Sequence, residues 1–357
     1  MEKHIKKMVS VLLVCVMSVM SVIAFDMKPV HAASGAITEA SGWLETAYVK
    51  WTPVTGATGY NVYVKSASAS DSAYVQLDDE LIRKYPSYMR ADAVGLKAGD
   101  YVMKIVPLNN GKENTAAAIV SDKLTVKAHD RSGFGFVNGT SSGAYNEDGT
   151  LKSNAVVIYI TEDTKNTVTL DVTGAGVCKG IQNILGGFKK GKDSRSLCVR
   201  IVGTITDPAV LTKGDLYVDT NKQGLTIEGI GDDAVVNGFG IVLKNCDNVE
   251  VRNIGVMNVN SSEGDNIGLQ QGNSHIWVHN NDYFYGDAGS DADQVKGDGA
   301  LDTKTSTYIT HSYNHFWDNG KCNLQGMKSE KTTNYITYHH NWYDHSDSRH
   351  PRIRTCT

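Results

Sequence analysis

The stretches Ile276-Trp-Val-His-Asn-Asn281, Ile309-Thr-His-Ser-Tyr-Asn314 and Ile336-Thr-Tyr-His-His-Asn341 decide the fold of this 357-residue chain. Each begins as a short β-rich run and reaches an asparagine at the same position. Asparagine tolerates the left-handed backbone that a sharp turn requires, and its amide can hydrogen-bond to an identical residue one coil away. Three asparagines in one register therefore indicate the stacked coils of a solenoid.

The repeat extends upstream of these three stretches. Comparable runs begin at Leu225 and Val249, so the five starts lie 24, 27, 33 and 27 residues apart. Strand-bearing repeats of roughly 25 residues with turns of variable length are typical of solenoids. The sequence predicts an all-β protein with a right-handed parallel β-helix. A sandwich whose asparagines align by chance is the alternative.

Residues 34–127 have a different pattern, typical of a small β-sandwich. Alternating runs at residues 47–51, 60–65 and 101–106 are each followed by turn residues. The segments Trp51-Thr-Pro-Val-Thr-Gly-Ala-Thr-Gly-Tyr60-Asn-Val-Tyr63 and Gly99-Asp-Tyr101 resemble a fibronectin type III module. We expect this module to be a spacer or accessory domain, with sugar binding as the alternative, and we expect residues 128–357 to form the β-helix.

The first 33 residues are typical of a secretory signal peptide. Lys3, Lys6 and Lys7 precede an apolar run over residues 8–25, and Val30-His31-Ala32 fits a small-residue cleavage site. An uncleaved membrane anchor is the alternative. We expect a secreted, extracellular monomer that has no membrane association after removal of the signal. The net charge of −4 and the lack of Lys/Arg runs argue against a nucleic-acid partner.

Acidic residues gather between the repeats. Glu263-Gly-Asp265 precedes one coil, and Asp298-Gly-Ala-Leu-Asp302 precedes the next. Residues four apart on an extended strand share a face, so Asp298 and Asp302 can converge. A solenoid would bring Asp265 beside them. Oxygen ligands without a nearby cysteine suit calcium better than a transition metal, although such acids are often merely solvated.

Basic residues end two successive repeats. Lys321 follows Trp317-Asp-Asn-Gly, and Arg349-His-Pro-Arg-Ile-Arg354 lies at the corresponding end of the next coil. Stacking would place Lys321 beside Arg349. Arginine forks suit a substrate carboxylate, whereas an ordinary charged surface is the alternative.

Six histidines lie in the same region, and they could either bind a metal or pack in the turns. His311 and His315 could share a face and hold zinc, but catalytic zinc usually has three protein ligands with fixed supporting partners. We expect stacking and turn hydrogen bonds instead for the group, which comprises His311, His315, His339, His340, His345 and His350.

Several of these segments resemble the pectate lyases of polysaccharide lyase family 1. The motifs, in chain order, are Thr226-Ile-Glu-Gly-Ile-Gly231, Asn248-Val-Glu-Val-Arg-Asn-Ile254, Asp298-Gly-Ala-Leu-Asp302, Tyr335-Ile-Thr-Tyr-His-His-Asn341 and Arg349-His-Pro-Arg-Ile-Arg354. The resemblance covers residues 198–354. It implies cleavage of α-1,4-linked polygalacturonate by β-elimination, with Ca²⁺ as cofactor.

The resemblance also implies a role for each charged residue. Asp265, Asp298 and Asp302 would hold calcium, with Glu263 as a secondary ligand. Arg349 would be the base that takes the C5 proton, and Lys321 and Arg354 would bind substrate carboxylates. Calcium and these cations would stabilise the enolate-like charge that develops.

Relatives of that family continue well past the arginine pair, whereas this sequence stops at Thr357. We therefore expect a C-terminally incomplete β-helix.

Three other functions are alternatives to the lyase. A polygalacturonase would need paired acid and base carboxylates, and its characteristic elements are absent. A pectin lyase would not be expected to keep the acidic cluster. A non-catalytic wall-binding β-helix would not need Lys321, Arg349 and Arg354 beside it.

Overall fold

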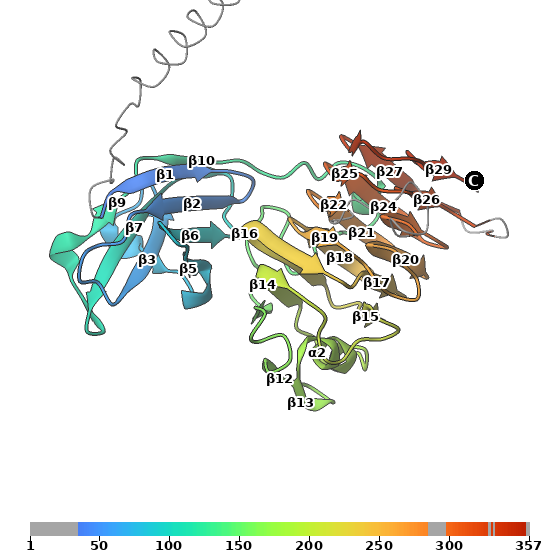
Figure 1. Cartoon of the computed structure of the whole chain (residues 1–357), viewed down its shortest axis with the longest axis horizontal. Helices are drawn as coiled ribbons and strands as arrows, with labels where there is room; N and C mark the ends of the chain where they lie inside the picture. The colour runs from blue at the N-terminus through green and yellow to red at the C-terminus, as the bar shows by residue number, and fades with distance from the viewer. Residues whose placement is uncertain (1–34, 285–297, 328–329, 331–332, 355–357) are drawn as a thin grey trace, which may run out of the picture.

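Two β modules joined by a linker make up the computed structural model, which describes residues 35–284, 298–327, 330 and 333–354 (Figure 1). The expected signal peptide, Cys15 and Cys356 lie outside these residues. The four described cysteines, Cys178, Cys198, Cys246 and Cys322, are all free. Within the described ranges, every helix is too short or too polar to cross a bilayer.

The N-terminal module is a β-sandwich of two antiparallel sheets. One sheet has the order β1 (Ile37–Gly42), β2 (Thr46–Trp51), β6 (Met89–Val94) and β5 (Ile82–Lys84). The other has the order β10 (Leu124–Val126), β7 (Gly99–Asn109), β3 (Gly59–Ser66) and β4 (Val75–Gln76), with β8 (Lys112–Glu113) and β9 (Ile119–Val120) also paired to β7. Trp51, Val62 and Met103 are fully buried between the sheets. The three strands expected in this segment are confirmed.

Short 3-10 helices lie between the strands, at Asp71–Ala73, Asp79–Leu81, Thr115–Ala117 and Phe134–Phe136.

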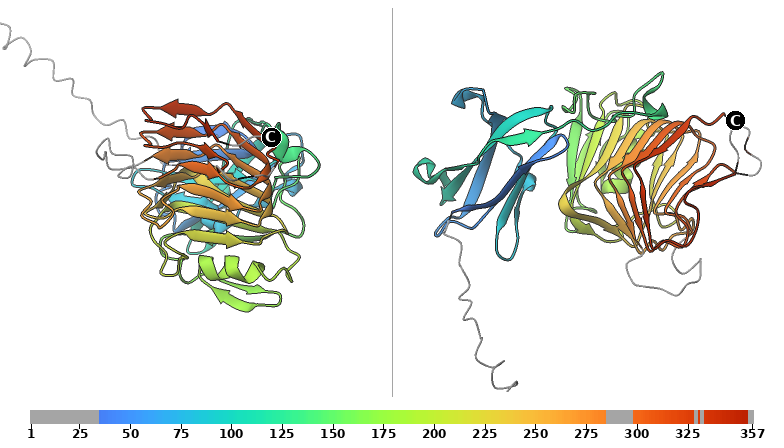
Figure 2. Two further views of the ribbon diagram at one scale, coloured as in Figure 1. Left: turned by 90° about the vertical axis from the view of Figure 1, so that its right-hand side faces the viewer. Right: turned by 90° about the horizontal axis from the view of Figure 1, so that it is seen from above.

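The C-terminal module is a parallel β-helix, as the repeat predicts (Figure 2). Its larger sheet joins β11 (Val156–Ile160), β14 (Leu197–Ile205), β16 (Leu225–Asn237), β18 (Asp247–Arg252), β21 (Ser274–His279), β24 (Thr307–Ser312) and β27 (Ile336–His339) to β19 (Gly255–Met257), β22 (Asp282–Phe284), β25 (His315–Trp317) and β28 (Trp342–Asp344). The second sheet has the order β15 (Leu216–Asp219), β17 (Ile241–Lys244), β20 (Ile267–Gln271), β23 (Leu301–Thr303), β26 (Leu324–Gln325) and β29 (Arg352–Ile353).

The five repeat starts stack in register. Leu225 pairs with Val249, Val249 with Ile276, Ile276 with Ile309, and Ile309 with Ile336. The three asparagines form the expected ladder, since Asn281 Nδ2 donates to Asn314 Oδ1 at 3.2 Å and Asn314 Nδ2 to Asn341 Oδ1 at 3.0 Å. The apolar residues at these starts lie inside the coil, where four of the five are fully buried.

One end of the β-helix core is covered by a helix that the repeat pattern did not predict. Helix α2 (Ile181–Phe188) lies below β15, beside the hairpin of β12 (Thr169–Val172) and β13 (Gly176–Lys179) (Figure 1). Its buried face includes Ile181, Ile184 and Phe188. A solenoid needs such a cap because its terminal coil otherwise exposes the apolar core.

The linker after β10 runs from the sandwich across the outer face of the larger sheet (Figure 1). Its backbone is anchored there by threonines of two neighbouring strands. Phe134 N–H donates to Thr337 Oγ1 at 3.0 Å, and Gly135 N–H to Thr310 Oγ1 at 3.0 Å. The linker is therefore fixed to the coils at residues 134 and 135.

Candidate active site

The coil register brings three acids from two successive coils together. Gly268 of β20 pairs with Asp302 of β23, and Asp298 N–H donates to the Gly264 carbonyl at 3.1 Å. Asp265 therefore lies next to the segment 298–302. β23 begins at Leu301, so Asp298 lies in the turn before it and not on the extended strand assumed from the sequence. The stacked backbones bring it to the cluster instead.

Asp265 and Asp302 are a buried carboxylate pair, with 0% and 1% of their surface exposed. Burial raises the pKa of Asp302 to about 6, against the effects of the Leu324 N–H, Lys304 and Arg349. Burial and the neighbouring Asp302 charge raise the pKa of Asp265 well above its usual range. Two anions without a cation between them are unfavourable in such a place.

Glycine makes the close approach of these acids possible. A Cβ atom built on Gly299 would lie 2.6 Å from Asp302 Oδ1 and 2.8 Å from Asp265 Oδ1. A Cβ on Gly268 would lie 3.1 Å from Asp265 Oδ2. The two carboxylates thus face one point that any larger residue at position 299 would occupy.

Two cations lie beside Asp298 and Asp302. Lys321 Nζ contacts Asp298 Oδ1 at 2.8 Å, and Arg349 Nη1 contacts Asp302 Oδ2 at 3.3 Å. Arg349 Nη2 also lies 4.0 Å from Asp298 Oδ1. Asp298 is half-buried, and burial raises its pKa. Lys321 and Arg349 outweigh this effect, so the pKa of Asp298 is lowered. The backbone of Lys321 forms a parallel β-bridge with Ser348, so Arg349 follows the residue that pairs with Lys321. The two cations are therefore neighbours on successive coils.

Two predicted site residues lie apart from this contact set. Arg354 is exposed beyond β29, where its N–H donates to the Gln325 carbonyl at 2.9 Å. Its guanidinium makes no ion pair with any described residue. Glu263 is partly buried and accepts a hydrogen bond from Gln270 Nε2 at 3.1 Å.

Lys304 is a site residue that the sequence reasoning missed. Its Nζ lies 3.5 Å from Asp265 Oδ2. Burial lowers the pKa of Lys304, but Asp265 and Asp302 outweigh this effect and raise it. The signal was present, because Lys304 is two residues after Asp302 and residues i and i+2 of a strand share a face. Asp215 was missed too. It is fully buried, burial raises its pKa, and it accepts from the Gly240 N–H at 3.1 Å.

The donor set fits a hard cation. The carboxylates supply only oxygen, and Asp265 Oδ1 is buried with no hydrogen-bond partner among the described residues. Calcium takes six to eight oxygen ligands and would neutralise the buried pair. Asp298 is engaged by Lys321, so it would have to turn from that lysine to join the same ion.

His311 and His315 do not converge. His311 is buried, with Nε2 2.9 Å from Thr303 Oγ1, whereas His315 Nδ1 lies 3.1 Å from Asp282 Oδ1. Ring stacking is present as expected, since His315 stacks on Trp342 with centroids 4.4 Å apart.

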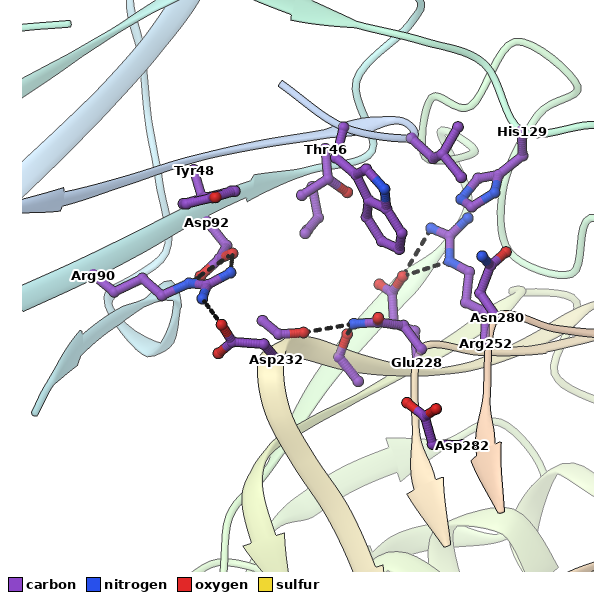
Figure 3. A pocket seen from close by; sticks show the side chains of 16 residues that line it. Thr46, Tyr48, Arg90, Asp92, His129, Glu228, Asp232, Arg252, Asn280 and Asp282 are labelled. Atoms are coloured by element: carbon purple, nitrogen blue, oxygen red, sulfur yellow. Dashed lines mark hydrogen bonds and ion pairs between the residues drawn. The ribbon is translucent and has the colours of Figure 1, made fainter. Parts of the chain in front are cut away.

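A separate cavity of about 380 Å³ lies between the sandwich and the β-helix (Figure 3). Its charged lining is internally paired. Arg252 Nε contacts Glu228 Oε2 at 3.0 Å, and Arg90 NH1 contacts Asp232 Oδ2 at 2.7 Å. Burial raises the pKa of Glu228, but Arg252 and Arg200 outweigh this effect and lower the pKa to about 2. These charges compensate one another within the lining, so we interpret the cavity as part of the interface between modules.

Comparison with known proteins gives one consistent family. Residues 205–357 match the family model described as pectate lyase. A pectate trisaccharide-lyase of Bacillus licheniformis is 31% identical over 173 residues, which cover 48% of this chain and 49% of the relative. Pectate lyase A of Emericella nidulans is 36% identical over 161 residues, which cover 42% and 47%. The chain thus spans about half the length of these curated relatives.

A solved structure shares the fold. A pectate lyase from Bacillus sp. N165, determined in complex with trigalacturonate, superposes with a TM-score of 0.50 at 22% identity, covering 63% of this chain and 64% of that one. At this identity the likeness bears on the fold, and it agrees with the parallel β-helix described above.

Proposed function

We propose that this chain acts as a calcium-dependent pectate lyase, cleaving α-1,4-linked polygalacturonate by β-elimination. The observation that carries the proposal is the buried Asp265–Asp302 pair beside Arg349. Such a pair is tolerable at neutral pH only next to a cation, and a guanidinium lies within 3.3 Å of one of its members. The pectate lyase family match over residues 205–357 supports the same chemistry.

Asp265, Asp298 and Asp302 would hold the ion, with Glu263 near enough to affect it electrostatically. Glu263 contributes to the raised pKa of Lys304, which contacts Asp265, so all four acids share one electrostatic neighbourhood. Bound calcium supplies a Lewis acid that lowers the energy of negative charge developing on a substrate carboxylate. The Gly299 and Gly268 positions keep space open beside these oxygens.

Arg349 would take the C5 proton. Its guanidinium is 16% exposed and is oriented by Asp302 and, more distantly, Asp298. Arginine ordinarily stays protonated. The aspartates that orient Arg349 would also hold the ion, and positive charge placed beside a base favours its neutral form.

Lys321, Lys304 and Arg354 would bind the anionic substrate. Lys321 and Lys304 flank the acids, and a polyanion would satisfy them when the aspartates turn to the metal ion. Arg354 is exposed, so it would bind a carboxylate farther along the polymer.

The test is an assay of product chemistry with polygalacturonate. β-Elimination yields an unsaturated uronate that absorbs in the ultraviolet, whereas hydrolysis yields reducing ends without that absorbance. We expect absorbance with wild type and a loss of at least about 100-fold for Arg349→Ala, since a general base contributes about 10²–10⁴ in rate. Arg352→Ala is the matched control, because Arg352 is exposed on β29. Reducing ends alone, or binding without turnover, would refute the lyase.

We propose that residues 1–33 direct export, that the sandwich of residues 34–127 is a fibronectin type III-like accessory module, and that the protein works outside the cell as a monomer. An extracellular polysaccharide substrate is consistent with these expectations.

A further inference from the structure

A second cluster of metal-ligating side chains lies on the larger sheet and has no part in the proposed lyase chemistry. Asp130 of the linker, His339 and His340 place one ligand atom each within 4.8 Å of one another. Among residues 35–284, 298–327, 330 and 333–354, this is the one group of three such side chains that meets that limit. His339 Nδ1 and His340 Nδ1 lie 2.9 Å apart.

The backbone explains how two consecutive histidines converge. Successive side chains of a strand point to opposite faces. His339 ends β27, but His340 has a positive φ of 53°. This left-handed residue breaks the alternation and turns both imidazoles to the same side. Asn280 and Tyr313, at the equivalent position of earlier coils, have φ values of 52° and 55°, so the turn belongs to the repeat.

Tyr313 holds both rings and the carboxylate in place. Its ring stacks on His340 with centroids 4.6 Å apart and lies edge-on to His339 at 5.5 Å. Its hydroxyl donates to Asp130 Oδ2 at 3.2 Å, while Ser132 N–H donates to Asp130 Oδ1 at 3.2 Å. Outer hydrogen bonds of this kind orient ligands in established metal sites.

The ligand chemistry selects a class of ion. Two imidazole nitrogens and one carboxylate suit a divalent transition metal better than calcium. At metal–nitrogen bonds of about 2.0–2.1 Å, nitrogens 2.9 Å apart subtend roughly 90° at the ion. That angle fits cis positions of a tetragonal complex, the geometry of Cu²⁺ and Ni²⁺.

We propose that Asp130, His339 and His340 bind a tetragonal divalent transition-metal ion that fastens the linker to β27. The adjacent linker residues are already fixed to the same strands, through Phe134 to Thr337 and Gly135 to Thr310. Asp130 and His339 are 209 positions apart in the sequence, and the ion would join them without any change in the course of the chain.

The experiment is a Cu²⁺ titration of the full-length protein in a non-chelating buffer with saturating calcium, followed by calorimetry and electron paramagnetic resonance. We expect a site with hyperfine coupling to two nitrogens. His340→Asn should weaken it at least 10-fold while keeping the fold, because Asn280 occupies the same turn position in an earlier coil. Asp130→Asn should also weaken it, and it leaves the coil untouched.

His275→Asn is the control. His275 also has a positive φ, at 52°, and stacks on a tyrosine, Tyr308, but contacts the single carboxylate of Asp247. This variant should bind Cu²⁺ like wild type. Equal affinity in wild type, His340→Asn and Asp130→Asn, or a spectrum without coupling to two nitrogens, would overturn the proposal.

Discussion

At the scale of single residues, the molecule keeps two carboxylates in a place where neither is stable as an anion without a partner. Asp265 and Asp302 are buried and close together, and the backbone between them is glycine at position 299. A buried acid pair of this kind destabilises the metal-free fold and is a common feature of functional sites.

Asp302→Asn should make the metal-free protein more stable above pH 6. The folded-state pKa of Asp302 is raised to about 6, so its stabilising contribution is complete below the unfolded pKa near 4 and is lost as pH rises through 6. The loss is on the order of 3 kcal/mol. Urea unfolding in chelator should show the difference between mutant and wild type growing by that amount from pH 4 to pH 7.5.

Asp298→Asn is the control of opposite sign. Burial raises the pKa of Asp298, but the hydrogen bond and charge of Lys321 outweigh this effect, so the pKa is lowered. The contribution of Asp298 to the free energy of unfolding is therefore present above the unfolded pKa and lost in acid. This variant should be less stable than wild type at neutral pH. A difference for Asp302→Asn that does not change with pH would contradict the buried-pair account.

Sequence reasoning reached the identity of these acids but not their state. The repeat register predicted that Asp265, Asp298 and Asp302 would lie together, but the strand spacing assumed for Asp298 was wrong, because that residue lies in the turn before β23. Their burial depends on how the turn before β23 packs, which no spacing reveals. The Asp130 cluster was out of reach for another reason, because it depends on the course of the linker across the sheet.

At the scale of elements, register was predictable because identical residues stack in a solenoid. The runs from Leu225 to Ile336 pair as their spacing predicts. Helix α2 was missed, although Ile181, Ile184, Leu185 and Phe188 have helical spacing. Gly186 and Gly187 lie in the same segment, and glycine disfavours a helix interior, so local propensity and tertiary packing disagree there.

Asn314→Ala should be costly for the coils. The Asn314 amide donates to the Val278 carbonyl at 2.9 Å and accepts from the Asn281 N–H at 3.2 Å, in a buried setting. Truncation leaves these groups without partners, so we expect a loss of roughly 2–4 kcal/mol in the free energy of unfolding. Asn183→Ala on the exposed face of α2 should cost less than about 1 kcal/mol. Equal losses in denaturant unfolding would disprove the role of the ladder.

At the scale of the whole molecule, buried ion pairs connect the sandwich, the linker and the β-helix. Glu45, the residue before β2, is fully buried. It binds Arg131 of the linker and lies 3.5 Å from Arg252 of β18. Its Oε1 also accepts the His129 N–H at 3.1 Å. One carboxylate therefore compensates cations from two other parts of the chain.

Glu45→Ala should uncouple the modules. Removing one partner of a buried network leaves uncompensated charge, at a cost of about 3–5 kcal/mol. We expect a single calorimetric transition in wild type and two separated transitions in the variant. Glu39→Ala, which breaks a partly exposed pair with Lys50, should change stability by less than about 1 kcal/mol and leave one transition. A single unshifted transition in Glu45→Ala would contradict this role.

Calcium-dependent β-elimination is tested most directly by the initial rate of unsaturated-product formation from polygalacturonate, followed by ultraviolet absorbance as free calcium is varied. We predict no rate in chelator, saturation with added calcium, and an Asp265→Asn variant that needs at least about 10-fold more calcium, as expected when a ligand is lost. A rate that is unchanged by chelator, or an unchanged calcium requirement in Asp265→Asn, would contradict it.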